Sequence, residues 1–365
     1  MLDDILYYVA LTKVSKIGPV NAKNLISYCG GAKEVFAAKP DKLEKIPGIG
    51  PFLSAIITAA DTLREAEKEV DFAIKNHTDI ITYHDSRYPR RLLQVESCPV
   101  VIYHKGTTDL NYFRTVAIVG TRTPTEQGKI ICEKIVDGLS VYNPLIISGL
   151  AFGIDALAHK KCVSLGIPTL GVLGHGLDRI YPGAHASLAE KMIKNGGLLT
   201  EFTSGTLPDK ENFPMRNRII SAMSDVVVVI ESKRKGGSII TAEFANEYNK
   251  DVFAVPGRVG DDFSEGCNKL IKQNKAHLLE SASDLAYIMR WEEMDKGRQI
   301  QGQLFPELDP VEQKVVDIIR SAKEITIDLI TYKLGLPPSE VSSLLLTMEF
   351  KGIIRTLPGK KFILN

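Results

Sequence analysis

Apolar residues follow two different periods along this chain, and the period changes at about residue 79. Before that position, Leu6, Val9 and Val14 recur near the spacing of one helix face. After it, short runs rich in β-branched residues alternate with stretches of helical spacing. The pattern predicts a helical domain over residues 1–78 and an α/β domain over residues 79–290.

Two short turns interrupt the helical region, at residues 16–20 and 45–50. Each places glycine where the chain must turn tightly between helices. The pair resembles helix-hairpin-helix motifs, in which the turn and the next helix offer backbone N–H groups to a DNA phosphate. The first turn, Gly18-Pro19, departs from the Gly-x-Gly of such motifs, whereas Gly48 and Gly50 keep it. A helical packing domain without a DNA contact explains the same turns.

Continuous apolar runs, separated by helical stretches, dominate residues 79–290. Such runs are typical of parallel strands that are covered on both faces, because the alternation of apolar and polar residues is lost when neither face meets water. The runs lie at residues 116–119, 145–147, 169–173, 198–200, 226–230 and 252–255, and two earlier ones at 80–83 and 100–103 extend the set. We therefore expect a mostly parallel sheet with helices on both faces.

The C-terminal part divides into a linker and a small domain. Residues 291–308 are polar and show no clear period, which predicts a linker. Residues 309–365 predict three helices, the second beginning with Ile325, and then a hairpin, which is a winged helix-turn-helix layout. The third helix carries Ser339, Glu340 and Ser343 but no Arg or Lys through Leu345. We favour protein contact, or no contact, over base recognition for this helix.

Composition limits the class of protein. The chain has 365 residues and a formal net charge of +1, so that any nucleic-acid surface must be a local patch. No apolar run approaches the roughly 20 residues needed to span a bilayer, and the acidic N-terminus lacks the basic flank of a secretory signal. Five cysteines without a Cys-x-x-Cys pair indicate reduced thiols and no zinc site. We expect a cytoplasmic protein without membrane contact.

The segments that follow the predicted strands carry glycine together with basic or hydroxyl groups. In an open parallel sheet, ligands bind outside the carboxyl ends of the strands. Gly120, Thr121 and Arg122 follow the first core strand, Ser148 and Gly149 follow the second, and Lys235 precedes two glycines after the fifth. These loops predict a phosphate-binding rim. Neither a Gly-x-Gly-x-x-Gly nor a Walker motif is present, so we expect no dinucleotide or ATP cofactor.

The segment at residues 211–220 has the most distinctive chemistry of the chain. It holds the candidate site residues Asn212, Phe213, Arg216, Asn217 and Arg218. Arginine beside an aromatic ring can bind phosphates and stack on bases. If the segment is helical, the two arginines cannot share one face, so one of them would face ligand and the other the protein. Solvated arginines at the start of a helix are an alternative explanation.

Acid–base catalysis has weak support in the sequence. Asp155 and His159 lie four residues apart and could pair on one helix face, but a structural hydrogen bond is the favoured interpretation. His175 lies in a candidate ligand loop without an obvious partner. In the same loop, Asp178 and Arg179 could contact ligand or could form a local ion pair. We therefore assign no catalytic residue and no metal ligand.

The ordered motifs closely resemble one family, the DNA processing protein A (DprA/Smf) family. The motifs run from Ile118-Val119-Gly120-Thr121-Arg122 through Ser148-Gly149-Leu150-Ala151-Phe152-Gly153-Ile154-Asp155 and Asn212-Phe213-Pro214-Met215-Arg216-Asn217-Arg218 to Phe253-Ala254-Val255-Pro256-Gly257. The resemblance implies a Rossmann-like core with an N-terminal helix-hairpin-helix or SAM-like domain and a C-terminal winged helix. It also implies a homodimer that binds single-stranded DNA and helps to load RecA recombinase in natural transformation.

Matched residue by residue, the DNA pocket of that family falls on the candidate residues given above. These are Gly120, Thr121, Arg122, Ser148, Gly149, Phe213, Arg216 and Arg218, and, less strictly, Asn212, Asn217 and Lys235. His175 departs from the small or polar residue that is usual at its position, which leaves the role of its loop open.

Two other functions compete with DNA binding. Related Rossmann-like phosphoribohydrolases cleave nucleoside monophosphates with a Pro-Gly-Gly-x-Gly-Thr-x-x-Glu loop. This chain keeps two glycines and Glu243, but Ile239 and Ile240 replace the Gly and Thr that would hold phosphate. That departure argues against hydrolysis. The third interpretation is a scaffold that binds partners through its winged helix.

Overall fold

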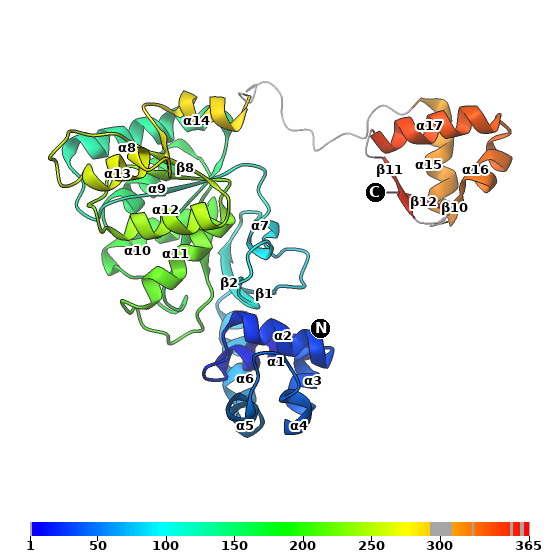
Figure 1. Cartoon of the computed structure of the whole chain (residues 1–365), viewed down its shortest axis with the longest axis horizontal. Coiled ribbons are helices and arrows are strands. Elements are labelled where there is room, and N and C mark those ends of the chain that lie inside the picture. The colour runs from blue at the N-terminus through cyan, green and yellow to red at the C-terminus, as the bar shows by residue number, and fades with distance from the viewer. Residues whose placement is uncertain (1, 293–308, 323–324, 351–352, 358–360, 365) are drawn as a thin grey trace. The chain divides into compact units, whose positions relative to one another are not determined.

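The computed structural model describes residues 2–292, 309–322, 325–350, 353–357 and 361–364 (Figure 1). The chain forms two compact units, Met1–Met294 and Asp295–Asn365. The predicted linker at 291–308 lies outside the described residues except for Trp291 and Glu292. Trp291 packs beside Tyr142, with ring centroids 6.3 Å apart, and thus belongs to the first unit. None of the helices described is long and apolar enough to cross a bilayer.

The N-terminal region is helical, as predicted. Its helices are α1 Leu2–Lys13, α2 Pro19–Cys29, α3 Ala32–Ala37, α4 Pro40–Leu43, α5 Pro51–Ala59 and α6 Leu63–Lys75. Helices α2 and α5 each begin with proline after a glycine N-cap, Gly18 or Gly50, because proline at the first helical position loses no hydrogen bond. The two glycine turns lie close together, since a Cβ on Gly48 would be 3.0 Å from the Asn21 side chain.

A nine-stranded sheet forms the core, in the order β1-β2-β6-β5-β4-β3-β7-β8-β9. The strands are β1 Asp79–Thr82, β2 Val101–Gly106, β3 Thr115–Val119, β4 Leu145–Ser148, β5 Thr169–Val172, β6 Gly196–Thr200, β7 Val226–Val229, β8 Asp251–Ala254 and β9 His277–Leu278. In this spatial order, all neighbours from β6 through β5, β4, β3, β7 and β8 to β9 pair in parallel. The pairs β1–β2 and β2–β6 are antiparallel. The predicted mostly parallel sheet is confirmed, and all eight predicted runs are strands.

Helices cover both faces of the parallel part (Figure 1). The helices and 3-10 turns of this region are α7 Arg90–Leu93, α8 Glu126–Leu139, η1 Ser140–Tyr142, α9 Ile154–Leu165, η2 Gly183–His185, α10 Ala186–Lys194, α11 Asn212–Met223, α12 Gly237–Glu247, α13 Glu265–Lys272 and α14 Ala282–Met289. In β7, Val227 and Val229 pack with α11, α12 and α13, while Val226 and Val228 pack with α8, α9 and α14. Alternate side chains thus enter opposite cores, which explains the continuous apolar runs.

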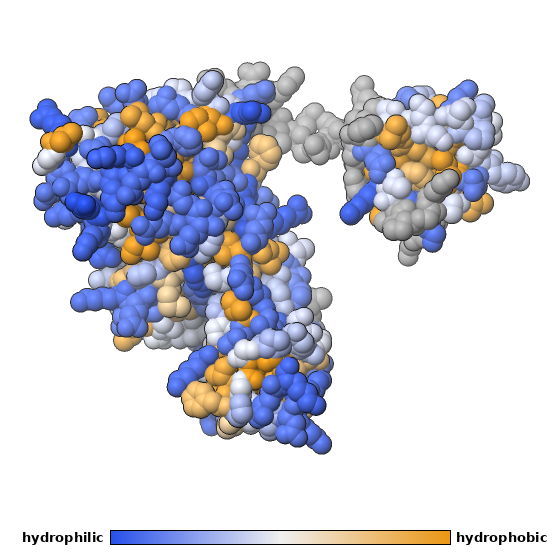
Figure 2. Space-filling model, viewed as in Figure 1, coloured by the Kyte–Doolittle hydropathy of each residue, from blue (hydrophilic) through white to orange (hydrophobic). Residues whose placement is uncertain are grey.

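The helical region packs on the antiparallel end of the sheet. Ile80 of β1 and Tyr103 of β2 share one apolar cluster with α1, α2 and α6. Glu69 of α6 is buried, and its carboxylate accepts hydrogen bonds from Ser204 N (2.8 Å) in the loop that leads from β6 to α11. The visible surface of this unit is mainly hydrophilic, with apolar residues in small patches (Figure 2).

The second unit is a winged helix. Its elements are α15 Pro310–Ala322, β10 Ile325–Thr326, α16 Ile327–Leu334, α17 Pro338–Phe350, β11 Ile354–Leu357 and β12 Lys361–Leu364. Ile325, which we predicted at the start of the second helix, lies instead in β10 and pairs with Phe362 of β12. That pairing buries Ile325 in the cluster of this unit, so its apolar character reflects the sheet and not the helix.

Candidate nucleic-acid interface

A cavity of about 660 Å³ lies at the carboxyl ends of the parallel strands. Its walls come from the segments that follow β3, β4, β5, β6 and β7. They include residues 119–122, Tyr181, residues 232–233 and residues 235–238. Strands β3 and β7 are neighbours, so their loops meet at one edge of the sheet. The first turns of α11, the helix that follows β6, line the cavity with Phe213, Pro214 and Arg216. This is the place where a doubly wound sheet binds its ligands.

Arg122 and Phe213 meet at this cavity although they follow strands that are not neighbours. The guanidinium carbon of Arg122 lies 5.4 Å from the centroid of the Phe213 ring, a cation–π distance. Tyr181 also stacks on Phe213, with its ring centroid 6.1 Å from that of Phe213 and an interplanar angle of 26°. The Arg122 side chain is exposed and makes no hydrogen bond or ion pair within the described part of the chain. Its charge is therefore available to a ligand.

Arg216 lines the cavity from a buried position. The side chain is 5% exposed, and its guanidinium donates to the carbonyl oxygens of Gly149 (2.6 Å) and Val172. Burial lowers its pKa to about 10, against the opposing charge of the buried Asp155. Arg216 thus remains protonated near neutral pH and joins the loop after β4 to the end of β5. Its role is to shape the cavity as well as to charge it.

At two of the predicted site residues, Gly120 and Gly149, a neighbouring side chain lies so close to the backbone that only glycine fits. A Cβ on Gly149 would lie 2.4 Å from the Arg216 guanidinium, and a Cβ on Gly120 would lie 2.5 Å from the Ile154 side chain. Contacts this short cannot be accommodated in a packed interior. Gly120 and Thr121 line the cavity, whereas Gly149 contributes by making room for Arg216.

Arg218 and Ser148, which we predicted as pocket residues, do not line the cavity. Arg218 forms a buried ion pair with Glu201 and donates to Ser97 O (2.6 Å). Ser148 is fully buried, and its hydroxyl donates to Ile118 O (2.6 Å), which joins β4 to β3. The structure thus decides between the two arginines of α11, since Arg216 faces the cavity and Arg218 faces the protein.

The remaining predicted residues divide in the same way. Asn217 lines the cavity and accepts a hydrogen bond from Arg216 Nε (3.1 Å). Lys235 lines it with an exposed side chain. Asn212 does not line it and instead donates to Leu207 O (3.2 Å), at the start of α11. Asn212 therefore orders the approach to the helix.

Sequence reasoning missed three residues that complete the site. Lys210 and Lys233 line the cavity as exposed cations, and Tyr181 provides a second ring, 47% exposed. The aromatic ring in a glycine-containing loop after β5 was the available signal for Tyr181. Helix α12 begins after Gly236 without a side-chain cap, and its first residues, Gly237 and Ser238, line the same cavity. The partial positive charge of the helix N-terminus therefore adds to that of Lys233. Together these groups form a local basic patch on a chain that is nearly neutral.

The structure gives the contacts of four polar residues whose roles the sequence left open. His159 bonds to Thr169 Oγ1 (2.6 Å) and not to Asp155, and burial lowers its pKa to about 3. His175 is buried, and its Nδ1 lies 2.9 Å from Gly176 O. Asp178 and Arg179 form a local ion pair (2.6 Å), in which Asp178 also accepts from Gly205 N (2.9 Å). All of these contacts are structural.

Comparison with known proteins gives the same assignment in both parts of the chain. Residues 79–290 match the family model of DNA recombination-mediator protein A, and residues 303–360 match that of the DprA winged helix domain. The chain is 32% identical to the protein Smf of Synechocystis sp. over 98% of each chain. It is 42% identical to the DNA processing protein DprA of Streptococcus pneumoniae over 55% of this chain and 71% of that protein.

Two solved structures share this fold. The X-ray structure of DNA processing protein A from Streptococcus pneumoniae is similar with a TM-score of 0.68 and 32% identity, and the match covers 79% of this chain and 99% of that one. A structure of DNA processing protein A from Helicobacter pylori, described for its single-stranded DNA binding mode, matches with a TM-score of 0.54 and 28% identity over 60% of this chain and 99% of that one. On this evidence the chain belongs to the DNA recombination-mediator protein A family, that of the DprA and Smf proteins.

Proposed function

We propose that this protein binds single-stranded DNA in the cavity at the carboxyl ends of its parallel strands, without reading its sequence. The observation that carries the proposal is the exposed Arg122 stacked on Phe213, beside the uncapped N-terminus of α12. Five cations line the cavity, namely Arg122, Lys210, Arg216, Lys233 and Lys235, against the buried carboxylate of Asp155. The Helicobacter pylori relative, whose structure concerns single-stranded DNA binding, supports the same ligand.

Backbone phosphates would contact the cations and the N-terminus of α12. Arg122 and Lys235 carry exposed charges that no described carboxylate neutralises, so each can bind a phosphate oxygen by a charge-assisted hydrogen bond. Arg216, held between Gly149 and Val172, supplies a fixed positive charge behind them. A phosphate-based grip of this kind is insensitive to base identity and weakens as salt rises.

Bases would stack on the rings of Phe213 and Tyr181. Every base has a π-face, so an aromatic platform accepts any sequence. The cavity offers no helix or ribbon placed to enter a major groove, and a paired base cannot turn its face to a ring. A single strand therefore suits this site better than a duplex.

A gel-shift comparison tests the proposal directly. The full chain is titrated against a single-stranded oligonucleotide, the blunt duplex of the same sequence and a second single strand of unrelated sequence. We expect both single strands to bind with similar affinity and more tightly than the duplex. Equal or stronger binding to the duplex would refute the assignment.

We further propose that the bound strand is handed to RecA recombinase by a homodimer of this protein, in the cytoplasm, during natural transformation. The family resemblance supports this step, and the relatives named DNA processing protein support a role in DNA processing. RecA filament growth on a strand coated with single-strand-binding protein should start faster when this protein is present. Sedimentation of the protein alone reports whether it is a dimer.

The hydrolase alternative receives no support from the geometry. Glu243, which would act in a phosphoribohydrolase, is exposed and does not line the cavity, whereas Ile240 does. We therefore propose that the protein is not an enzyme and that DNA binding needs neither ATP nor metal. Release of base from nucleoside monophosphates that is lost in Glu243→Ala would contradict this proposal.

A further inference from the structure

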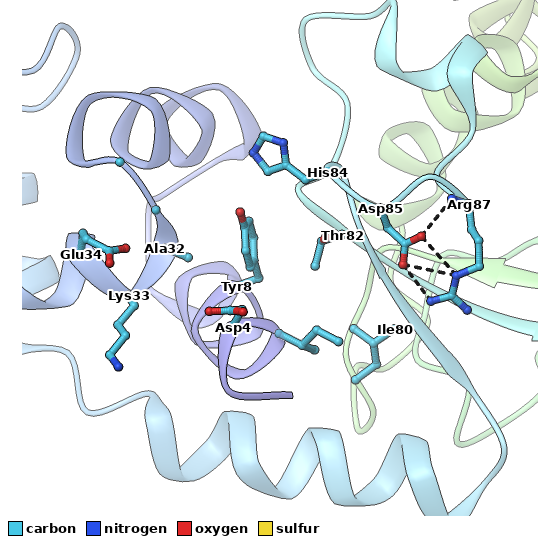
Figure 3. Close-up of a pocket in the computed structure, with 13 residues that line it drawn as sticks. Asp4, Tyr8, Ala32, Lys33, Glu34, Ile80, Thr82, His84, Asp85 and Arg87 are labelled. Carbon is cyan, nitrogen blue, oxygen red and sulfur yellow. Dashed lines mark hydrogen bonds and ion pairs between the residues drawn. The ribbon is translucent and has the colours of Figure 1, made fainter. Parts of the chain in front are cut away.

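A second hollow, separate from the DNA cavity, lies between the helical region and the first strand of the sheet (Figure 3). Its volume is about 700 Å³. One wall is formed by α1 and by the turn that leads into α3, and the opposite wall is β1 with the residues that follow it. Tyr8 forms the floor between them, edge-on to the rings of Tyr83 and His84, each 6.2 Å away. The floor is therefore aromatic, and the walls combine apolar residues, such as Ile5 and Ile80, with charged ones.

Strand β1 is the terminal strand of the nine-stranded sheet, so one of its edges has no partner strand among the strands that the structure describes. Tyr83 N donates to Val100 O (3.0 Å). The strand register then gives the ladder hydrogen bonds to Ile81 and Asp79, two and four residues earlier. The N–H groups of Ile80 and Thr82 must point away from β2, toward the open edge, and both residues line the hollow.

These outward groups are unused in the part of the chain that the structure describes. Thr82 O accepts from Asp85 N (2.9 Å), which closes the turn after the strand, but neither the Ile80 nor the Thr82 N–H has a partner there. An exposed strand edge of this kind is a template for an added strand. Proteins use it to bind extended peptides, with backbone hydrogen bonds for affinity and flanking pockets for specificity.

The charges around the hollow favour a basic ligand. Arg87 is matched by two carboxylates, Asp85 (2.8 Å) and Asp79 (3.1 Å). On the other wall, the negative charges of Asp4 and Glu34 reach Tyr8, since after burial they are the next causes that raise the pKa of its phenol. The ammonium of Lys33 is directed toward the Tyr7 ring, 5.8 Å from its centroid. Among the residues that the structure describes, three carboxylates line the hollow, Asp4, Glu34 and Asp85, beside two cations, Lys33 and Arg87.

We propose that this groove binds an extended, lysine- or arginine-containing peptide segment of a partner protein, which adds as a strand to the free edge of β1. The peptide backbone would pair with the N–H groups of Ile80 and Thr82. A long basic side chain would lay its aliphatic part on Tyr8 and place its charge between the carboxylates of the two walls. This surface is distinct from the DNA cavity, so that the protein could hold DNA and a partner at the same time.

The test uses the full chain and a fluorescein-labelled heptapeptide in which lysine and valine alternate, with anisotropy as the readout. A matched peptide has glutamate in place of every lysine. The key variant is Thr82→Pro, which removes an outward N–H but no ladder hydrogen bond, because proline is tolerated at the free side of an edge strand. Thr82→Val is its control, since valine keeps the N–H. Glu34→Lys reverses one wall charge.

We expect the lysine peptide to bind wild type and Thr82→Val with the same affinity. It should bind Thr82→Pro about tenfold more weakly, because the proline removes one backbone hydrogen bond to the peptide and its ring keeps the peptide backbone from approaching the strand. Glu34→Lys should weaken the lysine peptide about fivefold and strengthen the glutamate peptide. Amide hydrogen exchange on wild type gives an independent reading should Thr82→Pro fail to fold. The peptide should slow exchange at Ile80 and Thr82.

Three results would overturn the proposal. The first is equal binding of the lysine and glutamate peptides, and the second is no binding of either. The third is concentration-dependent self-association that Thr82→Pro abolishes, which would assign the edge to a second copy of this chain. Single-stranded DNA affinity, measured on the same samples, should be unchanged in all variants.

Discussion

The cavity at the carboxyl ends of the parallel strands and the third helix of the winged-helix unit, α17, both have shapes associated with nucleic-acid binding. Their surface chemistry differs. The cavity presents Arg122, Lys210, Lys233 and Lys235 around two aromatic rings. The exposed side chains of α17 in the described region are Pro338, Ser339, Glu340, Ser342, Ser343, Leu346 and Thr347, without a cation. A recognition helix without positive charge lacks the phosphate contacts that supply most DNA affinity. The difference teaches that charge, and not fold, separates the proposed DNA-binding surface from the other candidate.

The same contrast appears at smaller scale within α11. Arg216 and Arg218 are two residues apart, and both are nearly buried, at 5% and 8% exposure. Arg216 donates its hydrogen bonds to backbone carbonyl groups at the cavity wall, and the buried Asp155 is a nearby opposite charge without a direct ion pair. Arg218, in contrast, forms a direct ion pair with Glu201. A direct ion pair uses the donors of the guanidinium more completely, so Arg216 is the better placed of the two to act on an anion in the cavity.

The largest effect should follow removal of Arg216. Arg216→Ala leaves Asp155 buried without its compensating charge, and burial already raises the pKa of that carboxyl. We expect the free energy of unfolding to fall by about 3–5 kcal/mol, as measured by urea denaturation. The double variant Arg216→Met, Asp155→Asn is the control and should recover part of the loss, since it removes both charges together. Equal stability of Arg216→Ala and wild type would show that Arg216 does not hold these loops.

Arg122→Ala should weaken binding without affecting the fold. A charge-assisted hydrogen bond contributes roughly 1.5–3 kcal/mol, so the Kd for single-stranded DNA should rise about ten- to a hundredfold. The melting temperature should stay the same, because Arg122 is exposed and makes no hydrogen bond within the described chain. Fluorescence anisotropy with a labelled oligonucleotide measures the first quantity and thermal unfolding the second. Wild-type affinity in Arg122→Ala would place the ligand on other loops.

Removal of the aromatic rings at the cavity should have the next largest effect on DNA binding. Phe213→Ala should cost about 1–3 kcal/mol of binding free energy through lost stacking. Tyr181→Ala should cost less than Phe213→Ala, because Phe213 also stacks under Arg122. Tyr181→Phe is the matched control and should bind as wild type does, since it keeps the ring. If Phe213→Ala unfolds the protein, its ring serves the core and the stacking role must be abandoned.

Much of the fold, and part of the site, could be predicted from sequence for identifiable reasons. The eight strand runs were evident because most of their residues are buried and apolar, with few polar residues such as Thr169 and Thr200. Ser148 was misjudged because a hydroxyl after a strand has the same sequence signature whether it faces ligand or, as here, satisfies Ile118 O. Tyr181 was missed because only the fold brings the loop after β5 beside Phe213. Ile325 was misplaced because an apolar residue before a helix has no period of its own, and its pairing with Phe362 is a long-range contact.

Removal of the winged helix should have a small effect on DNA binding. A chain that ends at Glu292 keeps every residue lining the cavity, so its affinity for single-stranded DNA should stay within about threefold of the full chain, a difference below 1 kcal/mol. The isolated unit, residues 309–365, should not shift duplex DNA at physiological salt. A clear shift by that unit would remove the contrast between the two regions.

Arg179→Ala should have the smallest effect of all. Asp178 already neutralises this arginine at 2.6 Å, and exposed ion pairs contribute only about 0–1 kcal/mol. Neither DNA affinity nor melting temperature should change measurably. If Arg179→Ala fails to bind while Arg122→Ala binds normally, the contacting loop is the one after β5 and not the one after β3.

The most direct test of the account is the salt dependence of single-stranded DNA binding by wild type and Arg122→Ala. The logarithm of the association constant is measured against the logarithm of salt concentration by anisotropy. A phosphate contact to single-stranded DNA contributes about 0.7 to the magnitude of the slope. The account predicts that Arg122→Ala lowers the magnitude of the slope by about this amount, whatever the oligonucleotide sequence. Identical slopes for the two proteins would contradict the claim that this exposed arginine binds the DNA backbone.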